Sequence, residues 1–196
     1  MRNNEEERKS LYGKNFPTRL IAGIDVGGTN TRIKLESEDF SQNKIDLSPS
    51  LRYPISSKQE LLNQLSQLFK QKFKEKVITY CSIDFAGPVY QNQKVSMTNW
   101  QDQPEITLED LFQSGLPENK TLMLNDIEAA AYGIISLVET NQLDSAHCHA
   151  LYQSKPINTT GIPRGNMVII MPGTGLGTAG IVTVKKKNGK SDYYPI

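Results

Sequence analysis

A carboxylate followed by two glycines is the first feature of this sequence whose residue types could do chemistry. Asp25 stands near the end of an apolar, β-branched run, and Gly27-Gly28 separates that run from a second one that ends at Leu35. A Gly-Gly connection between two such runs predicts a β-hairpin with a type I′ turn, in which both glycines have positive φ. Such a turn leaves backbone N–H groups uncovered beside the hydroxyls of Thr29 and Thr31, and uncovered amides form a concavity suited to phosphate. The alternative is a plain hairpin without a ligand, and this stretch alone does not decide between the two.

Asp25 would lie at the mouth of this turn. Mg²⁺ prefers carboxylate oxygens together with water and substrate phosphates. The sequence therefore predicts that Asp25 holds Mg²⁺ through water, whereas the competing interpretation treats its carboxylate as an ordinary turn residue.

A second glycine-rich turn follows an apolar strand predicted at Met167–Pro172. The turn comprises Gly173, Thr174, Gly175 and Gly177. Gly175, Gly177 and Gly180 match the dinucleotide fingerprint G-x-G-x-x-G, which requires a helix directly after the glycines. The residues that follow, 179–184, are β-branched and typical of a strand. This context excludes the dinucleotide fold and leaves either a phosphate-binding turn or a ligand-free glycine hairpin.

Asp126 lies between a predicted strand, Thr121–Leu124, and a predicted helix whose apolar residues recur at helical spacing through Val138. One interpretation is that Asp126 caps the helix, and for this residue taken alone capping is favoured. The other is that it lies at the carboxyl end of a strand, where open α/β sheets bind their ligands. An ionised carboxylate there could accept the proton of a substrate hydroxyl whose oxygen attacks phosphorus, and a helix N-terminus favours the ionised form.

Composition limits the classes of function. The chain has 196 residues, 37% of them hydrophobic, and a net charge of +1, which favours neither a nucleic acid nor an anionic membrane as partner. No apolar run approaches the roughly 20 residues that span a bilayer, and the charged segment Met1–Lys9 is no signal peptide. Two cysteines far apart in sequence fit a reduced compartment. These features predict a cytoplasmic protein.

The elements that would position these residues alternate between strands and helices. Leu51–Ile55 predicts an edge strand, and Ser57 begins a helix whose apolar residues from Leu61 to Phe73 form one face. Thr107 and Asp110 have the spacing of a capping box at the start of a short helix that ends near residue 113. Further strands are predicted at 77–86 and 89–97, a polar tail at 1–18, and a long loop at 141–164, in which His147, Cys148 and His149 are interpreted as loop residues rather than as metal ligands.

Five motifs, in order, resemble those of the bacterial-type glucokinases in the actin-like ATPase and sugar-kinase superfamily. The resemblance runs from about residue 20 to the end of the sequence. The motifs are Asp25-Val-Gly-Gly-Thr-Asn-Thr-Arg32, Asp84-Phe-Ala-Gly-Pro-Val89, Met97-Thr-Asn-Trp100, Leu124-Asn-Asp-Ile-Glu-Ala129 and Pro172-Gly-Thr-Gly-Leu-Gly177.

The resemblance implies an α/β fold of the actin-like ATPase (ribonuclease H-like) type. It implies a smaller lobe at 19–128, after the tail, and the first part of a larger lobe at 129–196. It also implies ATP and Mg²⁺ as cofactors, glucose or a related hexose as partner, and a possible homodimer. The implied phosphate-binding residues are Ile24, Asp25, Val26, Gly27, Gly28 and Thr29 in a first loop and Gly173, Thr174, Gly175 and Gly177 in a second. The implied sugar contacts are Asn99, Asn125 and Asp126, with Asp126 as the catalytic base.

The sequence departs from the family pattern at its end. It stops at Ile196, before a Glu-Gly-Gly-His segment that supplies further sugar contacts in relatives. We therefore expect one of two functions. The first is ATP-dependent phosphorylation of glucose to glucose 6-phosphate, at the start of glycolysis. The second is that of a truncated, catalytically impaired remnant that only binds sugar, phosphate or a protein partner.

Overall fold

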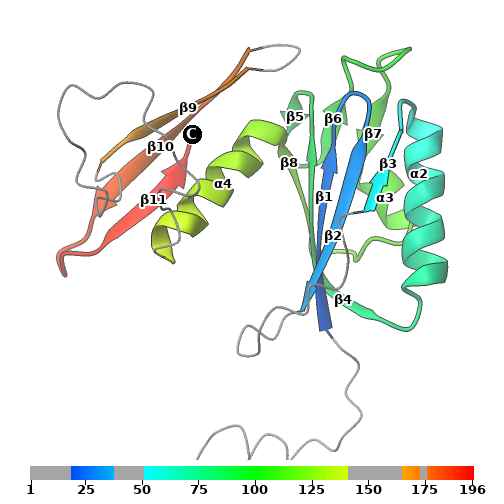
Figure 1. Cartoon of the computed structure of the whole chain (residues 1–196), viewed down its shortest axis with the longest axis horizontal. Helices are drawn as coiled ribbons and strands as arrows, with labels where there is room; N and C mark the ends of the chain where they lie inside the picture. Colours follow the sequence, from blue (N-terminus) through cyan, green and yellow to red (C-terminus); the bar gives the residue numbers. More distant parts are fainter. Residues whose placement is uncertain (1–18, 38–50, 141–164, 173–175) are drawn as a thin grey trace, which may run out of the picture. The chain divides into compact units, whose positions relative to one another are not determined.

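The computed structural model describes residues 19–37, 51–140, 165–172 and 176–196. The chain forms two compact units, which divide after Leu124 (Figure 1). None of the helices in the described ranges is long and apolar enough to cross a membrane.

A five-stranded sheet forms the centre of the first unit, with the strand order β3-β2-β1-β4-β8. Its strands are β1 (Arg19–Val26), β2 (Thr31–Ser37), β3 (Leu51–Tyr53), β4 (Val77–Phe85) and β8 (Thr121–Asn125). β1 runs antiparallel to β2 and parallel to β4, and β3 pairs with β2 at one edge, as the sequence predicted for this strand. In β1, Ile24 and Val26 are buried while Asp25 is half-buried, because successive side chains of a strand point to opposite faces.

Helix α2 (Lys58–Ser66) begins at Ser57, whose hydroxyl accepts a hydrogen bond from the Glu60 backbone N–H. The helix continues into the π-helical segment η1 (Gln67–Lys72), where Phe73 N–H donates to the Leu68 carbonyl at 2.8 Å. The adjacent residues Leu68 and Phe69 are both buried in this wider turn. The predicted apolar face is confirmed, and the π-helical turn is an addition that the helical period does not predict.

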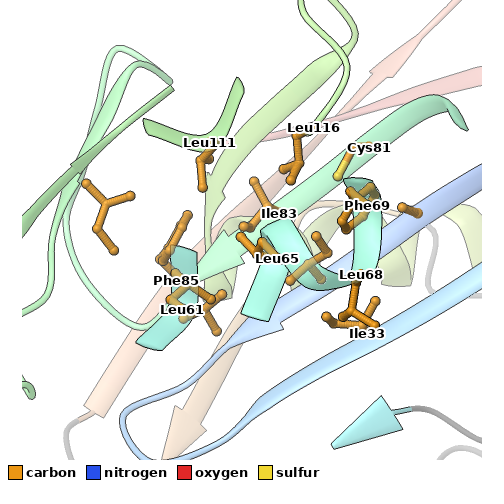
Figure 2. Packing of buried hydrophobic residues seen from close by; sticks show 14 of the residues in the cluster. Ile33, Leu61, Leu65, Leu68, Phe69, Cys81, Ile83, Phe85, Leu111 and Leu116 are labelled. Atoms are coloured by element: carbon orange, nitrogen blue, oxygen red, sulfur yellow. The ribbon is translucent and has the colours of Figure 1, made fainter. Parts of the chain in front are cut away.

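Packing of α2 against the sheet forms the core of this unit (Figure 2). Leu61 and Leu65 belong to one buried cluster with Ile33 of β2 and with Ile83 and Phe85 of β4. Burial on this side fixes the register of the strands, because a shift by one residue would move every core side chain to the other face. The same register puts Asp25 on the face opposite to the core.

A small antiparallel sheet completes the first unit, with β5 (Val89–Tyr90), β6 (Lys94–Ser96) and β7 (Glu105–Thr107). Gln91 and Asn92 form the tight turn between β5 and β6, with φ of 51° and 56°. Helix α3 (Leu108–Gln113) follows β7 and has both hydrogen bonds of the predicted capping box between Thr107 and Asp110. The capping-box prediction is therefore confirmed, although Asp replaces the usual Glu.

The second unit contains helix α4 (Asp126–Glu139) and an antiparallel sheet in the order β11-β10-β9. Its strands are β9 (Met167–Pro172), β10 (Leu176–Lys185) and β11 (Ser191–Pro195). Ala131 and Ile135 of α4 are buried in one cluster with Ile181 of β10. A hairpin turn joins β10 and β11, in which Gly189 has a φ of 79° and Lys186 N–H donates to the Lys190 carbonyl.

Candidate functional site

The loop between β1 and β2 is wider than the sequence predicted. Val26 pairs with Thr31, so four residues, 27–30, connect the strands, and Gly27 N–H donates to the Asn30 carbonyl at 2.9 Å. Neither Gly27 nor Gly28 has a φ in the left-handed region. The predicted type I′ turn is therefore wrong, because Asn30 rather than a two-residue Gly-Gly turn closes the loop.

Gly28 is required here for a close approach rather than for a left-handed conformation. A Cβ at residue 28 would lie 3.3 Å from the Cβ of Asn99, so the backbone of the loop lies directly beside that exposed side chain. The next residue, Trp100, donates a hydrogen bond from its indole Nε1 to the Gly28 carbonyl at 3.1 Å. Two segments separated by about 70 positions, one predicted for phosphate and one for sugar, are thus in contact within the first unit.

Asp25 lies in the strand that leads into this loop. It is the cross-strand neighbour of Arg32 on β2, and Arg32 Nη1 lies 3.1 Å from Asp25 Oδ2. The Asp25 side chain is 43% exposed, so a ligand can approach its carboxylate from solvent. In the described part of the chain, no cluster of three or more His, Cys, Asp or Glu residues could hold a metal ion. Asp25 thus belongs to no such cluster among the described residues, and its role as a ligand of Mg²⁺ stays a prediction.

Arg52, a residue without a predicted role, supports the loop from its exposed side. Arg52 of β3 donates from Nε to Asn30 Oδ1 at 3.2 Å, and Asn30 Nδ2 donates to the Thr29 hydroxyl at 3.0 Å. The sequence gives no signal for Arg52, because its place beside the loop follows from the pairing of β3 with β2. Trp100 occurs in one of the motifs shared with glucokinases, but the sequence does not predict its contact with Gly28.

Asn125 and Asp126 lie at the junction of β8 and α4. Asn125 is the N-cap residue, and its Oδ1 accepts a hydrogen bond from Ile127 N–H at 3.0 Å. Asp126 is the first residue of the helix, and its Oδ1 accepts from the same N–H at 2.9 Å. The position that an ordinary cap would occupy therefore belongs to Asn125. This removes the main support for interpreting Asp126 as a cap alone.

Gly177 lies in β10, beyond the turn to which the sequence assigned it. It pairs with Met171 of β9, and a Cβ at this position would lie 2.8 Å from Ile127 Cγ1 and closer still to Cδ1. The absence of a side chain therefore lets β10 pack against the first turn of α4, beside Asp126. Of the other residues in the predicted second phosphate loop, Gly173, Thr174 and Gly175 lie outside the described residues, as do His147, Cys148 and His149. Their roles stay predictions.

Cys81 is not a nucleophile in this site. Its side chain is buried in the core of the first unit, and burial raises the pKa of the thiol to about 12. The thiol is thus protonated at neutral pH, and thiolate chemistry is excluded at this position.

Comparison with known proteins identifies the class to which this site belongs. Among solved structures, the chain is similar to glucokinase from Balamuthia mandrillaris in complex with glucose, with a TM-score of 0.73 over 91% of this chain and 48% of that chain, at 20% identity. The chain therefore has the α/β, actin-like ATPase fold of these sugar kinases. The family model described as Glucokinase matches residues 21–191, and the chain belongs to this family.

Curated relatives agree with that assignment. The chain is 32% identical over 166 residues to "Probable glucokinase 2" of Trichomonas vaginalis, which covers 83% of this chain and 44% of the relative. It is 30% identical over 184 residues to "Glucokinase" of Campylobacter jejuni subsp. doylei, which covers 92% of this chain and 46% of the relative. The chain thus spans less than half the length of these relatives.

Proposed function

We propose that the protein transfers the γ-phosphoryl group of ATP to glucose or a related hexose and forms the 6-phosphate. Membership of the Glucokinase family supports this reaction, and so does the glucose bound to the solved relative from Balamuthia mandrillaris. The observation that carries the proposal is the contact between Gly28 and Asn99, because it joins the proposed phosphate loop to an exposed polar side chain suited to sugar hydroxyls. We place the reaction in the cytosol, which fits the free thiol of Cys81.

In the proposed reaction, Asn99 and Asn125 bind hydroxyl groups of the sugar and Asp126 accepts a proton. The 6-hydroxyl oxygen attacks the γ-phosphorus, the bond from that phosphorus to the β–γ bridging oxygen breaks, and ADP leaves with the bond's electrons. The proton of the attacking hydroxyl passes to the Asp126 carboxylate. The Asp126 carboxylate lies in the first turn of α4, so a helix fixes its backbone. A positioned carboxylate contributes typically 10²–10⁴-fold to such a step, roughly 3–5 kcal/mol.

The phosphates of ATP would lie against the first loop, 27–29, and against the second, 173–177. In the first loop the amides of Gly28 and Thr29 would face phosphate, because the Gly27 N–H donates to the Asn30 carbonyl. Little covalent chemistry is required of the protein in phosphoryl transfer, so positioning and neutralisation of charge dominate. Asp25 fits a Mg²⁺ ion that arrives with the nucleotide, because Mg²⁺ is usually bound by one or two carboxylates plus water and phosphates. When bound, Mg²⁺ would neutralise charge on the phosphates.

The direct test is product formation by the full-length protein. Incubation with MgATP and glucose should yield glucose 6-phosphate, measured through NADP⁺ reduction by added glucose-6-phosphate dehydrogenase. Parallel reactions with mannose and fructose, followed by ADP release, would define which hexoses are accepted. Absence of hexose-dependent ADP release with all three sugars would contradict the proposal.

A further inference from the structure

We propose that Trp100 is a positioning residue that holds the first phosphate loop in register with Asn99 and thereby couples nucleotide binding to hexose binding. The inference rests on the proposed function, because it takes the loop as the phosphate site and Asn99 as a sugar contact. It assigns a role to a residue that touches neither substrate.

The contact joins a buried ring to a partly buried carbonyl. Trp100 is 3% exposed, and its single side-chain donor, the indole N–H, is used on the Gly28 carbonyl at 3.1 Å. A partly buried carbonyl that loses its donor bears part of the cost of desolvation, so this hydrogen bond is more costly to remove than a fully exposed one. The Gly28 backbone is therefore held at a fixed position relative to the indole.

The indole itself is fixed by the turn that contains it. Trp100 N–H donates to the Met97 carbonyl at 3.3 Å, and the Trp100 carbonyl accepts from Gln103 N–H at 3.1 Å. Met97 N–H in turn donates to the Pro104 carbonyl at 3.0 Å, which closes the segment. Trp100 is thus anchored through its backbone as well as through its buried ring.

Asn99 precedes Trp100 and shares this support. Its side chain lies against Gly28, with only 3.3 Å between its Cβ and the place of a Cβ at residue 28. A displacement of the loop therefore moves atoms that contact Asn99, and a displacement of Asn99 moves the loop. The other side-chain contact to the loop, from Arg52 to Asn30, is on the exposed side. Trp100 is the buried support, and it is on the same segment as the sugar contact.

A single-atom change tests this role. Site-specific incorporation of the benzothienyl isostere of tryptophan at residue 100 changes N–H to S at this position alone. The isostere preserves the shape of the ring, and Trp100→Phe provides a second variant made by ordinary mutagenesis. Calorimetry on the full-length protein would measure the affinity for the magnesium complex of AMPPNP, with and without saturating glucose. The same titrations give the affinity for glucose.

Asn92→Gly is the matched control. Asn92 Nδ2 also donates to a backbone carbonyl, that of Met123 at 2.8 Å, and it lies in the same unit. Its φ of 56° suits glycine, so the substitution removes the side-chain hydrogen bond without backbone strain. This control separates a loss of coupling from a general loss of stability.

In the wild-type protein, saturating glucose should tighten AMPPNP binding by at least about fivefold, and the control should keep that factor. In the isostere and in W100F, nucleotide binding should weaken roughly 5–30-fold and the coupling factor should fall below about twofold. Wild-type coupling in both Trp100 variants, or its absence in the wild type, would overturn the inference. A wild-type protein that binds neither ligand would contradict the proposed function itself, and the inference with it.

Discussion

Gly177 of β10 packs against Ile127 in the first turn of α4, so closely that a Cβ on the glycine would lie 2.8 Å from Ile127 Cγ1. Ile127 is the residue after Asp126, the proposed base, and its backbone N–H donates to the Asp126 carboxylate. The second glycine-rich segment therefore packs, through Gly177, beside the residue proposed as the base.

Gly177→Ala should lower kcat of glucose phosphorylation by roughly tenfold, because the methyl group displaces Ile127 and with it Asp126. Overpacking of this kind also costs about 1–3 kcal/mol of stability. The measurement is kcat together with thermal unfolding. Gly133→Ala in the middle of α4 is the control: nothing lies within 4 Å of its added Cβ, and it should leave kcat unchanged and stabilise the helix by about 1 kcal/mol.

The double variant G177A with Ile127→Val tests the cause. Valine lacks the Cδ1 atom that the new methyl group would meet, so the pair should recover part of the activity that G177A loses, and their effects should not be additive. Additive losses in the double variant would contradict packing as the mechanism.

Gly28→Ala should weaken the binding of both substrates, glucose and MgATP. Its Cβ would lie 3.3 Å from Asn99 Cβ, a distance that forces the loop and Asn99 apart by a few tenths of an ångström. The expected result is an increase of roughly tenfold in KM for glucose and for MgATP, because misplacement of binding groups costs about 1–2 kcal/mol at such contacts. Gly23→Ala in β1 is the control, since nothing lies within 4 Å of its added Cβ. Equal KM values in G28A and G23A would argue against the contact.

The lowered pKa of Asp110 predicts that the free energy of unfolding depends on pH. Partial burial raises the pKa of this carboxyl, but hydrogen bonds from Lys58 and from the backbone and hydroxyl of Thr107 outweigh burial, so its pKa lies below the ordinary value. A lowered pKa in the folded state stabilises the protein above the unfolded pKa of about 3.9, and this contribution is lost as the pH falls through the folded value.

Asp110→Asn should therefore destabilise the first unit by about 1 kcal/mol at pH 7, and the difference from wild type should shrink below about pH 4. Urea unfolding of the wild type and of D110N, carried out between about pH 2 and pH 7, measures this difference in the free energy of unfolding. Glu105→Gln, which removes an exposed ion pair with Lys94 in the same unit, should have a smaller effect. A difference for D110N that persists unchanged to pH 2 would refute the assignment.

Thr31→Val should stabilise the protein by about 1 kcal/mol. The Thr31 hydroxyl is buried and has no hydrogen-bond partner within the part of the chain that the structure describes. Valine has the same shape, removes the unsatisfied group and suits a strand. Thr107→Val is the contrasting variant, because the Thr107 hydroxyl accepts from Asp110 N–H, and its loss should cost about 1 kcal/mol. Chemical unfolding of both variants should give changes of opposite sign.

Local patterns in the sequence were sufficient for several elements of the fold. The apolar face of α2 and the capping box of α3 depend on neighbouring residues, and both are confirmed. The resemblance to glucokinases is confirmed by the family match. The roles assigned to Asn99, Asn125 and the glycine turns stay predictions.

Contacts between distant segments could not be predicted in this way. The Gly-Gly pair predicted a type I′ turn, but Asn30 closes a four-residue loop, and the position of Gly28 is explained by Asn99 and Trp100. Likewise, Gly177 was assigned to a turn, although its place in β10 is explained by the side chain of Ile127. In both cases a glycine permits close packing, and no local rule identifies the segment that approaches it.

The most direct test of the proposed mechanism is kcat for glucose phosphorylation by Asp126→Asn in the full-length protein. The substitution keeps the shape of the side chain and its ability to accept the Ile127 hydrogen bond but removes a carboxylate that can take a proton. We expect kcat to fall by roughly 10²–10⁴-fold with KM for MgATP nearly unchanged, and Asp102→Asn, at an exposed position, to behave as wild type. A kcat for D126N within about threefold of wild type would contradict Asp126 as the general base.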